Sequence, residues 1–336
     1  MPITNVLDFE KPLAELDAAI DELRSVSEAE GIDRADEISA LEENRDRLAR
    51  QIFSNLSPWD KTLMARHPNR PYSLDYIRVI FDDFVELHGD RLFADDKAVV
   101  GGVGFLDGKP VMVIGQQKGR DIKERQLRNF GSLKPEGFRK AVRLMKMAEK
   151  FGRPIVVFVD TPAADCSIGA EERGISEAIA RSMMEMALLE VPVIAVVIGE
   201  GGSGGALGVG VANRVLMQEH AIYSVIPPEG CAAILSEFDR NPARAPEAAD
   251  ALNITAQRNL ELGVIDEVIP EPLGGAHRNG EQAAAAVRDA VVRHLADLEN
   301  MSPQELAEQR YARFRDMGVY AVEPPSEDES VEEVPG

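Results

Sequence analysis

The feature that most constrains the fold is a glycine cluster that directly follows an apolar run. The run Val191–Ile198 contains only Val, Ile, Ala and Pro, and Gly199–Gly205 then supplies five glycines in seven residues. A run that is apolar throughout is typical of a strand buried on both faces. Glycines let another group approach the backbone closely, and a helix that starts there presents free N–H groups and a positive dipole end. The sequence therefore predicts a strand–turn–helix unit that binds an oxyanion or another anion through its backbone.

Three chemistries make use of a glycine turn of this kind, and the sequence supports them unequally. A phosphate cradle requires a lysine after the last glycine, and none follows here. The segment Gly201–Gly205 matches G-x-S-x-G, which makes Ser203 a candidate nucleophile of a serine hydrolase. Histidines and aspartates occur downstream, but no spacing singles out a triad. The third interpretation uses backbone N–H groups alone, to hold an enolate or a ureido oxygen.

The rest of the chain predicts an α/β fold with helices at both ends. Residues 11–55 carry apolar side chains at helical spacing in two stretches, which predicts an antiparallel helical hairpin. A further helix is expected to carry Ile77, Ile80, Phe81 and Phe84. Strands and helices alternate through residues 98–270, starting with a hairpin at Asp107-Gly108, and residues 280–317 are helical again.

A second loop rich in small residues follows the apolar strand at 154–159. It covers residues 160–174, so two consecutive predicted strands each end in a loop of small residues. Such loops meet when their strands are neighbours in a parallel sheet. Two backbone donors, one from each loop, can then form a single oxyanion hole.

Composition excludes several classes of function. A formal net charge of −21 argues against nucleic-acid binding, because phosphates would repel the chain. No apolar run reaches about 18 residues, so no membrane span is expected. The two cysteines, Cys166 and Cys231, cannot form a zinc ribbon, so we expect no metal site and a reducing, cytoplasmic setting.

Two charged segments stand out. A basic cluster in the otherwise acidic chain binds phosphates of a CoA-type ligand, binds an acidic partner or forms a solvated loop. Its residues are Lys118, Arg120, Lys123, Arg125, Arg128 and Lys134, of which Lys118, Arg120, Arg125 and Arg128 are the candidates for substrate binding. The acidic end of the chain, residues 319–336, is predicted to be a disordered tail.

The order of the motifs resembles that of the alpha subunits of bacterial multi-subunit acetyl-CoA carboxylase carboxyltransferases. The resemblance covers nearly the whole chain. The motifs that carry it are Leu7-Asp-Phe-Glu10, Ala65-Arg-His-Pro68, Arg70-Pro-Tyr72, Asp95-Asp-Lys97, Gly101-Gly102, Gln117-Lys-Gly-Arg120, Gly169-Ala-Glu-Glu-Arg-Gly174, Gly199–Ala206, Pro228-Glu-Gly-Cys231 and residues 270–279.

The resemblance implies a crotonase-like (ClpP/crotonase) β-β-α superhelix over residues 61–318, preceded by a helical hairpin arm at 1–60. It also implies transfer of a carboxyl group from carboxybiotin to acetyl-CoA, giving malonyl-CoA, the first committed step of fatty acid biosynthesis. The implied partners are a beta subunit, in a heterotetramer of two alpha and two beta chains, the biotin carboxyl carrier protein and biotin carboxylase. Biotin belongs on the carrier and is not attached to this chain, although Leu144-Met-Lys-Met147 resembles an attachment motif.

The resemblance also assigns roles at the glycine cluster. The backbone oxyanion donors are expected at Gly204, Gly205, Ala206 and Ala163. The biotin-binding residues are expected at Gly201, Gly202, Ser203, Pro162 and Gly169.

One loop departs from the family pattern. Where the family reads D-T-P-G-A-Y-P-G, this chain reads Asp160-Thr-Pro-Ala-Ala-Asp-Cys-Ser167. Ala163 replaces a glycine and tolerates a positive φ poorly, whereas Asp165 adds a negative charge. A catalytically impaired paralogue is therefore an alternative to the active enzyme.

Overall fold

The computed structural model describes residues 5–318, which fold around one mixed eight-stranded sheet. The strand order is β1-β2-β3-β4-β5-β6-β8, and β7 pairs with β5. Strand β2 pairs antiparallel with both β1 and β3, and all other strand pairs are parallel. The strands are β1 (Asp82–Glu86), β2 (Val99–Leu106), β3 (Lys109–Gln116), β4 (Ile155–Thr161), β5 (Val193–Gly202), β6 (Arg214–Gln218), β7 (Ile222–Ser224) and β8 (Glu267–Ile269).

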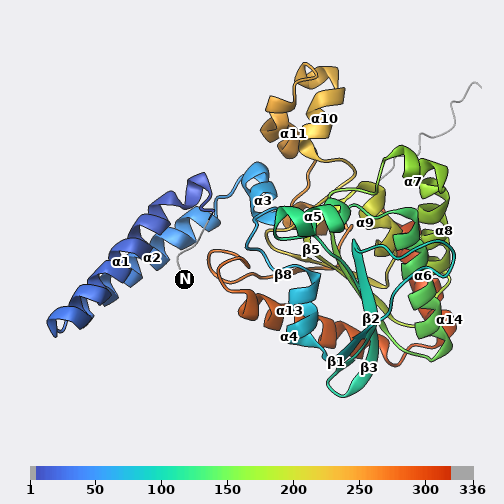
Figure 1. Cartoon of the computed structure of the whole chain (residues 1–336). Coiled ribbons are helices and arrows are strands. Elements are labelled where there is room, and N and C mark those ends of the chain that lie inside the picture. Colours follow the sequence, from blue (N-terminus) through green and yellow to red (C-terminus); the bar gives the residue numbers. More distant parts are fainter. Residues whose placement is uncertain (1–4, 319–336) are drawn as a thin grey trace, which may run out of the picture.

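Helices cover both faces of the sheet (Figure 1). One face packs against α6 (Pro135–Lys150), α8 (Ile175–Ala187) and α9 (Ser203–Gly210). The other face packs against α4 (Ser73–Ile80) and α13 (Gly280–Leu298). Strands β4 and β5 are buried along their whole length because they lie in the middle of the sheet. This arrangement places the carboxyl ends of β4 and β5 side by side.

Two helical extensions leave this body (Figure 1). The arm consists of α1 (Lys11–Glu30) and α2 (Ala35–Phe53), which pack against each other as the sequence predicts. Gly31 ends α1 with a φ of 67°, a conformation that glycine adopts without a steric penalty. The second extension contains α10 (Pro228–Ile234) and α11 (Ala245–Ala251), with a small core of its own around Phe238. The remaining helices are α3 (Pro58–Ala65), α5 (Ile122–Leu127), α7 (Ile168–Glu172), α12 (Ala256–Glu261) and α14 (Pro303–Arg315).

The structure confirms the α/β fold and the hairpin at Asp107-Gly108, and it corrects two element boundaries. The helix expected to include Phe84 ends at Ile80, and Phe84 lies in strand β1. The glycine cluster begins inside β5, which continues to Gly202 rather than ending at Ile198. Within residues 5–318, no helix is both long and apolar enough to cross a membrane. The predicted acidic tail at 319–336 lies outside the described residues.

Candidate active site

The loop after β4 lies directly against the start of α9. A methyl group added at Gly202 would come within 2.0 Å of the carbonyl oxygen of Pro162. The same change at Gly205 would bring it within 2.5 Å of the carbonyl carbon of Ala163. Strands β4 and β5 pair in parallel up to Thr161 and Gly201, so both loops leave the same edge of the sheet. The predicted meeting of the two loops is therefore confirmed, and two glycines make this contact possible.

The start of α9 is free of internal partners. No side chain caps this helix, and within residues 5–318 the N–H groups of Gly204 and Gly205 have no acceptor, whereas the N–H of Ala206 is at the position where the helical hydrogen bonds begin. Ser203, the first helical residue, has a φ of 52°, which is uncommon for a residue with a side chain. The start of the helix therefore presents unpaired N–H donors and the positive end of the helix dipole, which together suit the binding of a negatively charged ligand oxygen.

A buried glutamine fixes the position of this helix relative to the sheet. The Nε2 atom of Gln116, at the end of β3, donates to the carbonyl oxygen of Gly205 at 2.7 Å. Its Oε1 atom accepts from the N–H of Asp160 at 3.0 Å. Because the side chain is fully buried, these bonds hold β3, β4 and α9 in one arrangement.

The loop that departs from the family pattern is internally consistent. Ala163 does not have a positive φ, so its methyl group causes no backbone strain. The carboxylate of Asp165 accepts from the N–H of Ser167 at 2.9 Å, and the Ser167 hydroxyl accepts from the N–H of Ala170 as the N-cap of α7. The new polar side chains thus stabilise the loop and the start of α7.

The remaining predicted site residues have mixed surroundings. The N–H of Ala163 donates to the Oγ1 atom of Thr161 at a long 3.3 Å. Gly201 packs against the ring of Tyr223, where a methyl group would come within 2.6 Å of the ring. Gly169 is the second residue of α7. The roles of Ala163, Gly201 and Gly169 in binding stay predictions.

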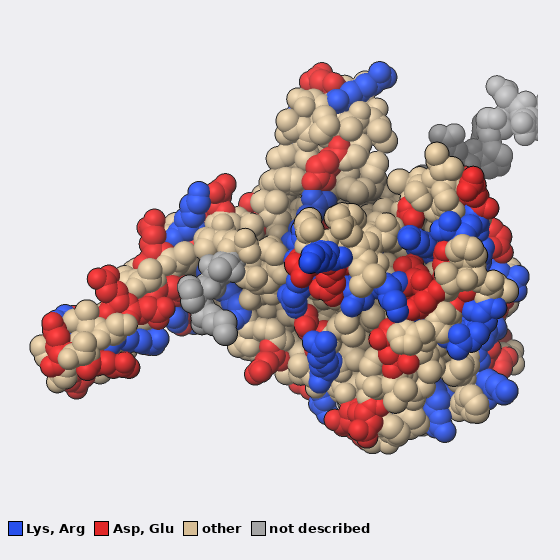
Figure 2. Space-filling model, viewed as in Figure 1, with Lys and Arg blue, Asp and Glu red and all other residues tan. Residues whose placement is uncertain are grey.

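Of the four basic residues predicted to bind substrate, Arg120, Arg128 and Lys118 already have carboxylate partners within the protein. Arg120 pairs with Asp75, and Arg128 pairs with Glu124 at 2.9 Å. Arg125 donates to the carbonyl oxygen of Gly119 at 3.1 Å and forms no ion pair within residues 5–318. Figure 2 shows basic and acidic side chains interspersed on this face, without a continuous basic patch.

The fourth basic residue, Lys118, belongs to a buried ion-pair network. Its ammonium group lies 2.8 Å from Asp160, at the end of β4, and 2.6 Å from Glu200 on β5. Arg66 binds Glu200 at 2.6 Å and also pairs with Glu229 at the start of α10. Burial opposes ionisation of Glu200, but Lys118 and Arg66 hold its pKa at about 2. The network neutralises carboxylates next to the glycine cluster.

A cavity of about 180 Å³ opens between this network and the loop after β4. It lies next to the start of α9, because Pro162 lines it and also contacts Gly202. Its lining residues are Arg66, Tyr72, Lys118, Gly119, Arg125, Phe130, Pro162 and Glu200.

The histidines needed for a serine hydrolase are engaged elsewhere. His294 contacts Glu267 at 2.8 Å, and His277 contacts Glu10 at 3.0 Å. The ring of His220 packs against that of Phe53, with centroids 5.9 Å apart. Within residues 5–318, no hydrogen bond joins Ser203 to a histidine.

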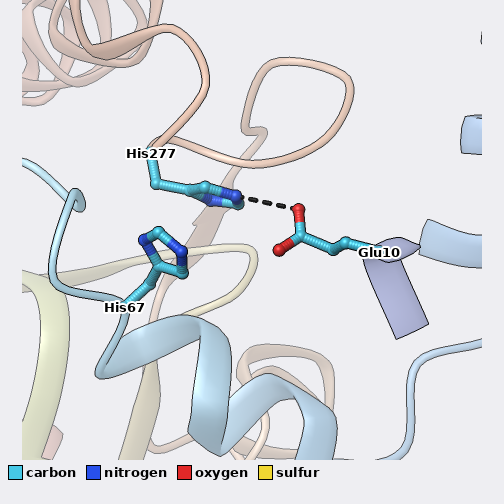
Figure 3. A group of neighbouring side chains, drawn as sticks. All are labelled: Glu10, His67 and His277. Atoms are coloured by element: carbon cyan, nitrogen blue, oxygen red, sulfur yellow. Dashed lines mark hydrogen bonds and ion pairs between the residues drawn. The ribbon is translucent and has the colours of Figure 1, made fainter. Parts of the chain in front are cut away.

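A separate cluster of Glu10, His67 and His277 joins the base of the arm to the body (Figure 3). The two imidazole rings stack with centroids 4.1 Å apart. Both ring nitrogens of His67 have backbone partners, the carbonyl oxygen of Asn5 at 2.8 Å and the N–H of Asn69 at 3.1 Å. Glu10 accepts from Arg278 and from its own turn as well as contacting His277. These contacts define a buried junction that fixes the arm.

Comparison with known proteins defines first the class and then the family. The fold is that of the crotonase-like carboxyltransferases. Transcarboxylase 12S, with methylmalonyl-coenzyme A bound, superposes with a TM-score of 0.52 over 76% of this chain and 44% of its own, at 18% identity. A Pseudomonas malonate decarboxylase hetero-dimer gives 0.53 over 66% of this chain and 89% of its own, at 20% identity.

The sequence comparisons are more specific. A family model described as acetyl co-enzyme A carboxylase carboxyltransferase-like matches residues 6–318. Acetyl-coenzyme A carboxylase carboxyl transferase subunit alpha of Syntrophotalea carbinolica is 58% identical over 93% of this chain and 97% of its own. The subunit of the same name from Halorhodospira halophila is 55% identical over 94% and 98%. The chain belongs to this carboxyltransferase family.

Proposed function

We propose that this chain is the alpha half of an acetyl-CoA carboxyltransferase and that the start of α9 holds the ureido oxygen of biotin. The observation that carries the proposal is the uncapped start of α9, where the N–H groups of Gly204 and Gly205 have no partner within residues 5–318, pressed against the loop after β4. Sequence relatives at 55–58% identity carry the acetyl-coenzyme A carboxylase name.

The chain's own groups contribute to the reaction through electrostatics. When bound on a separate carrier protein, biotin would supply the carboxyl group for malonyl-CoA and a nitrogen base for the methyl proton of acetyl-CoA. The fixed N–H donors at the start of α9 would hold the ureido oxygen and stabilise negative charge on it by about 3 kcal/mol each. Gln116 keeps these donors in place, and the Lys118 network prevents nearby carboxylates from opposing the charge.

The proposal assigns acetyl-CoA mainly to a beta subunit, with the active site between the chains in a heterotetramer of two alpha and two beta chains. Biotin carboxylase loads the carrier. Biotin is not attached at Lys146, since that side chain lies on helix α6 in contact with Glu149 and Glu185.

Co-expression with the matching beta chain tests the proposal. We expect transfer of carboxyl groups from malonyl-CoA to free biotin by the complex and none by this chain alone. An inactive complex, or turnover by the single chain, would contradict the assignment. A serine hydrolase would instead be labelled at Ser203 by a fluorophosphonate.

A further inference from the structure

The cavity beside the glycine cluster contains one cationic side chain without an anionic partner. Of its three cations, Lys118 is held by Asp160 and Glu200, and Arg66 is held by Glu200 and Glu229. Arg125 has no carboxylate partner within residues 5–318, and it donates to the carbonyl oxygen of Gly119 through Nε. The outer two nitrogens of this half-buried guanidinium are therefore free to bind a ligand.

One residue that lines this cavity, Phe130, has a backbone conformation that is uncommon for a bulky side chain. Asn129 has a φ of 46° and Phe130 has a φ of 55°, on consecutive residues with side chains. Such conformations cost free energy and persist where the surrounding structure imposes them, often at ligand sites. The Phe130 side chain is 54% exposed although it lines the cavity. In the isolated chain, the exposed Phe130 side chain therefore gains little hydrophobic stabilisation to offset the free-energy cost of its backbone conformation.

The size and charge of the cavity favour a carboxylate over the phosphates of CoA. A volume of about 180 Å³ admits a small group but lies below the roughly 300–1,000 Å³ of a pocket for a whole ligand. A nucleotide diphosphate would require several free cations, and one is present. A single guanidinium matches a carboxylate, which it can bind through two parallel hydrogen bonds.

We propose that Arg125 binds the carboxylate that is transferred, and that Phe130 forms an apolar wall of the same subsite. This inference rests on the proposed function. It reassigns Arg125 from the phosphates of CoA to the reacting group. Pro162 supplies the geometric link, since it lines the cavity and contacts Gly202 at the start of α9. The subsite and the backbone donors thus lie next to each other.

The test compares two ligands that differ by this carboxylate. In the assembled enzyme, with free biotin as acceptor, Arg125→Gln is expected to raise the KM for malonyl-CoA about 10- to 100-fold, as for the loss of a hydrogen bond to a charged group. The inhibition constant of acetyl-CoA and the KM for biotin stay within about twofold. Calorimetric titration of the complex with each CoA ester gives the same contrast without turnover. Lys123→Gln is the matched control, because it removes an exposed charge on the same helix outside the cavity.

A second variant separates a binding role of Phe130 from a structural one. Glycine adopts a positive φ freely, so Phe130→Gly is expected to leave the melting temperature of the complex undiminished. It admits water around Arg125, which weakens the ion contact, and it therefore raises the KM for malonyl-CoA by about threefold or more.

Other outcomes identify which idea fails. If Arg125→Gln raises the malonyl-CoA and acetyl-CoA constants together, Arg125 binds the CoA portion and the inference is wrong. It is also wrong if neither constant changes. In both cases the wild-type complex is active and the proposed function stands. If the wild-type complex were inactive, the proposed carboxyltransferase function itself would be wrong.

Discussion

Gln116 donates a hydrogen bond of 2.7 Å to the carbonyl oxygen of Gly205, across 89 residues of sequence. The bond is fully buried, and it attaches the helix of the proposed oxyanion site to the end of β3. Because Gln116 also accepts from the N–H of Asp160, one side chain aligns the two elements that form the site. The positions of the N–H donors at the start of α9 thus depend on the buried hydrogen bonds of Gln116.

The first prediction concerns this close packing. Gly205→Ala places a methyl group 2.5 Å from the backbone of Ala163, so the loop or the helix must move. We expect transfer by the assembled enzyme to fall about 100-fold or more, which corresponds to the loss of one aligned donor at about 3 kcal/mol. Gly210→Ala in the same helix is the control, since its methyl group meets only the Tyr223 hydroxyl, at 3.5 Å. Equal activity of the two variants would show that the loop contact is unimportant.

The second prediction concerns Ser203. Its hydroxyl group has no histidine partner within residues 5–318, and the donors that matter here are N–H groups that alanine retains. We expect Ser203→Ala to lower turnover by less than about tenfold, well short of the roughly 10⁶-fold cost of removing a catalytic serine. Steady-state kinetics on the assembled variant provide the measurement. A collapse of turnover with intact assembly would restore the nucleophile hypothesis.

The third prediction concerns the buried ammonium group of Lys118. Lys118→Met removes the cation that Asp160 and Glu200 share, so that within residues 5–318 Glu200 keeps its ion pair with Arg66 and Asp160 has no direct ion pair. Breaking a buried pair in this way costs about 3–5 kcal/mol, which urea unfolding can measure. Lys109→Met is the control, because its pair with Glu299 is exposed and contributes less than about 1 kcal/mol. Adding Glu200→Gln to Lys118→Met should recover part of the loss.

The sequence predicted those parts of the site that have local signals. The β5–α9 unit follows from one apolar run and its glycines, and the meeting of the two loops follows from parallel strand order. The Lys118 network was missed, because Arg66 lies 134 residues from its partner Glu200 and no sequence pattern indicates that their side chains meet. Strand β1 was also missed, since Phe84 continues the helical spacing of Ile77 and Ile80. Only pairing with β2 shows that the chain is extended there.

The fourth prediction concerns the pH dependence of the arm junction. Burial, with a further contribution from His277, holds the pKa of His67 below its ordinary value of 6.5. The unfolded chain therefore binds a proton at this position more readily than the folded chain does, and stability falls as the pH drops below about 6.5. Burial opposes ionisation of Glu10, but His277 and the Leu7 N–H lower its pKa below 4.5 overall, so a further loss follows in more acidic solution.

Thermal unfolding and limited proteolysis of the arm between pH 8 and pH 5 measure this effect. We expect cleavage near the arm base to accelerate in acid. His67→Asn should flatten the dependence, although buried His220, whose pKa is also lowered by burial, leaves a residual slope. An identical pH profile in the variant would show that the junction does not respond to protons.

The last prediction concerns the loop that departs from the family pattern. Ala163 and Asp165 raised the hypothesis of an impaired paralogue, through backbone strain and through repulsion of carboxybiotin. The structure gives Ala163 an ordinary φ, and it directs the Asp165 carboxylate to the N–H of Ser167, at the start of α7. We therefore expect that changing Ala163, Asp165, Cys166 and Ser167 to Gly, Tyr, Pro and Gly leaves the KM for biotin within about threefold. The reverted loop should also be less stable, by roughly 1 kcal/mol, because the Asp165 turn and the Ser167 cap are lost together. Asp165→Asn isolates the charge, since the amide oxygen can still accept from Ser167. If that single variant lowers the KM for biotin tenfold, the carboxylate does repel the substrate and the impaired-paralogue hypothesis regains its electrostatic basis.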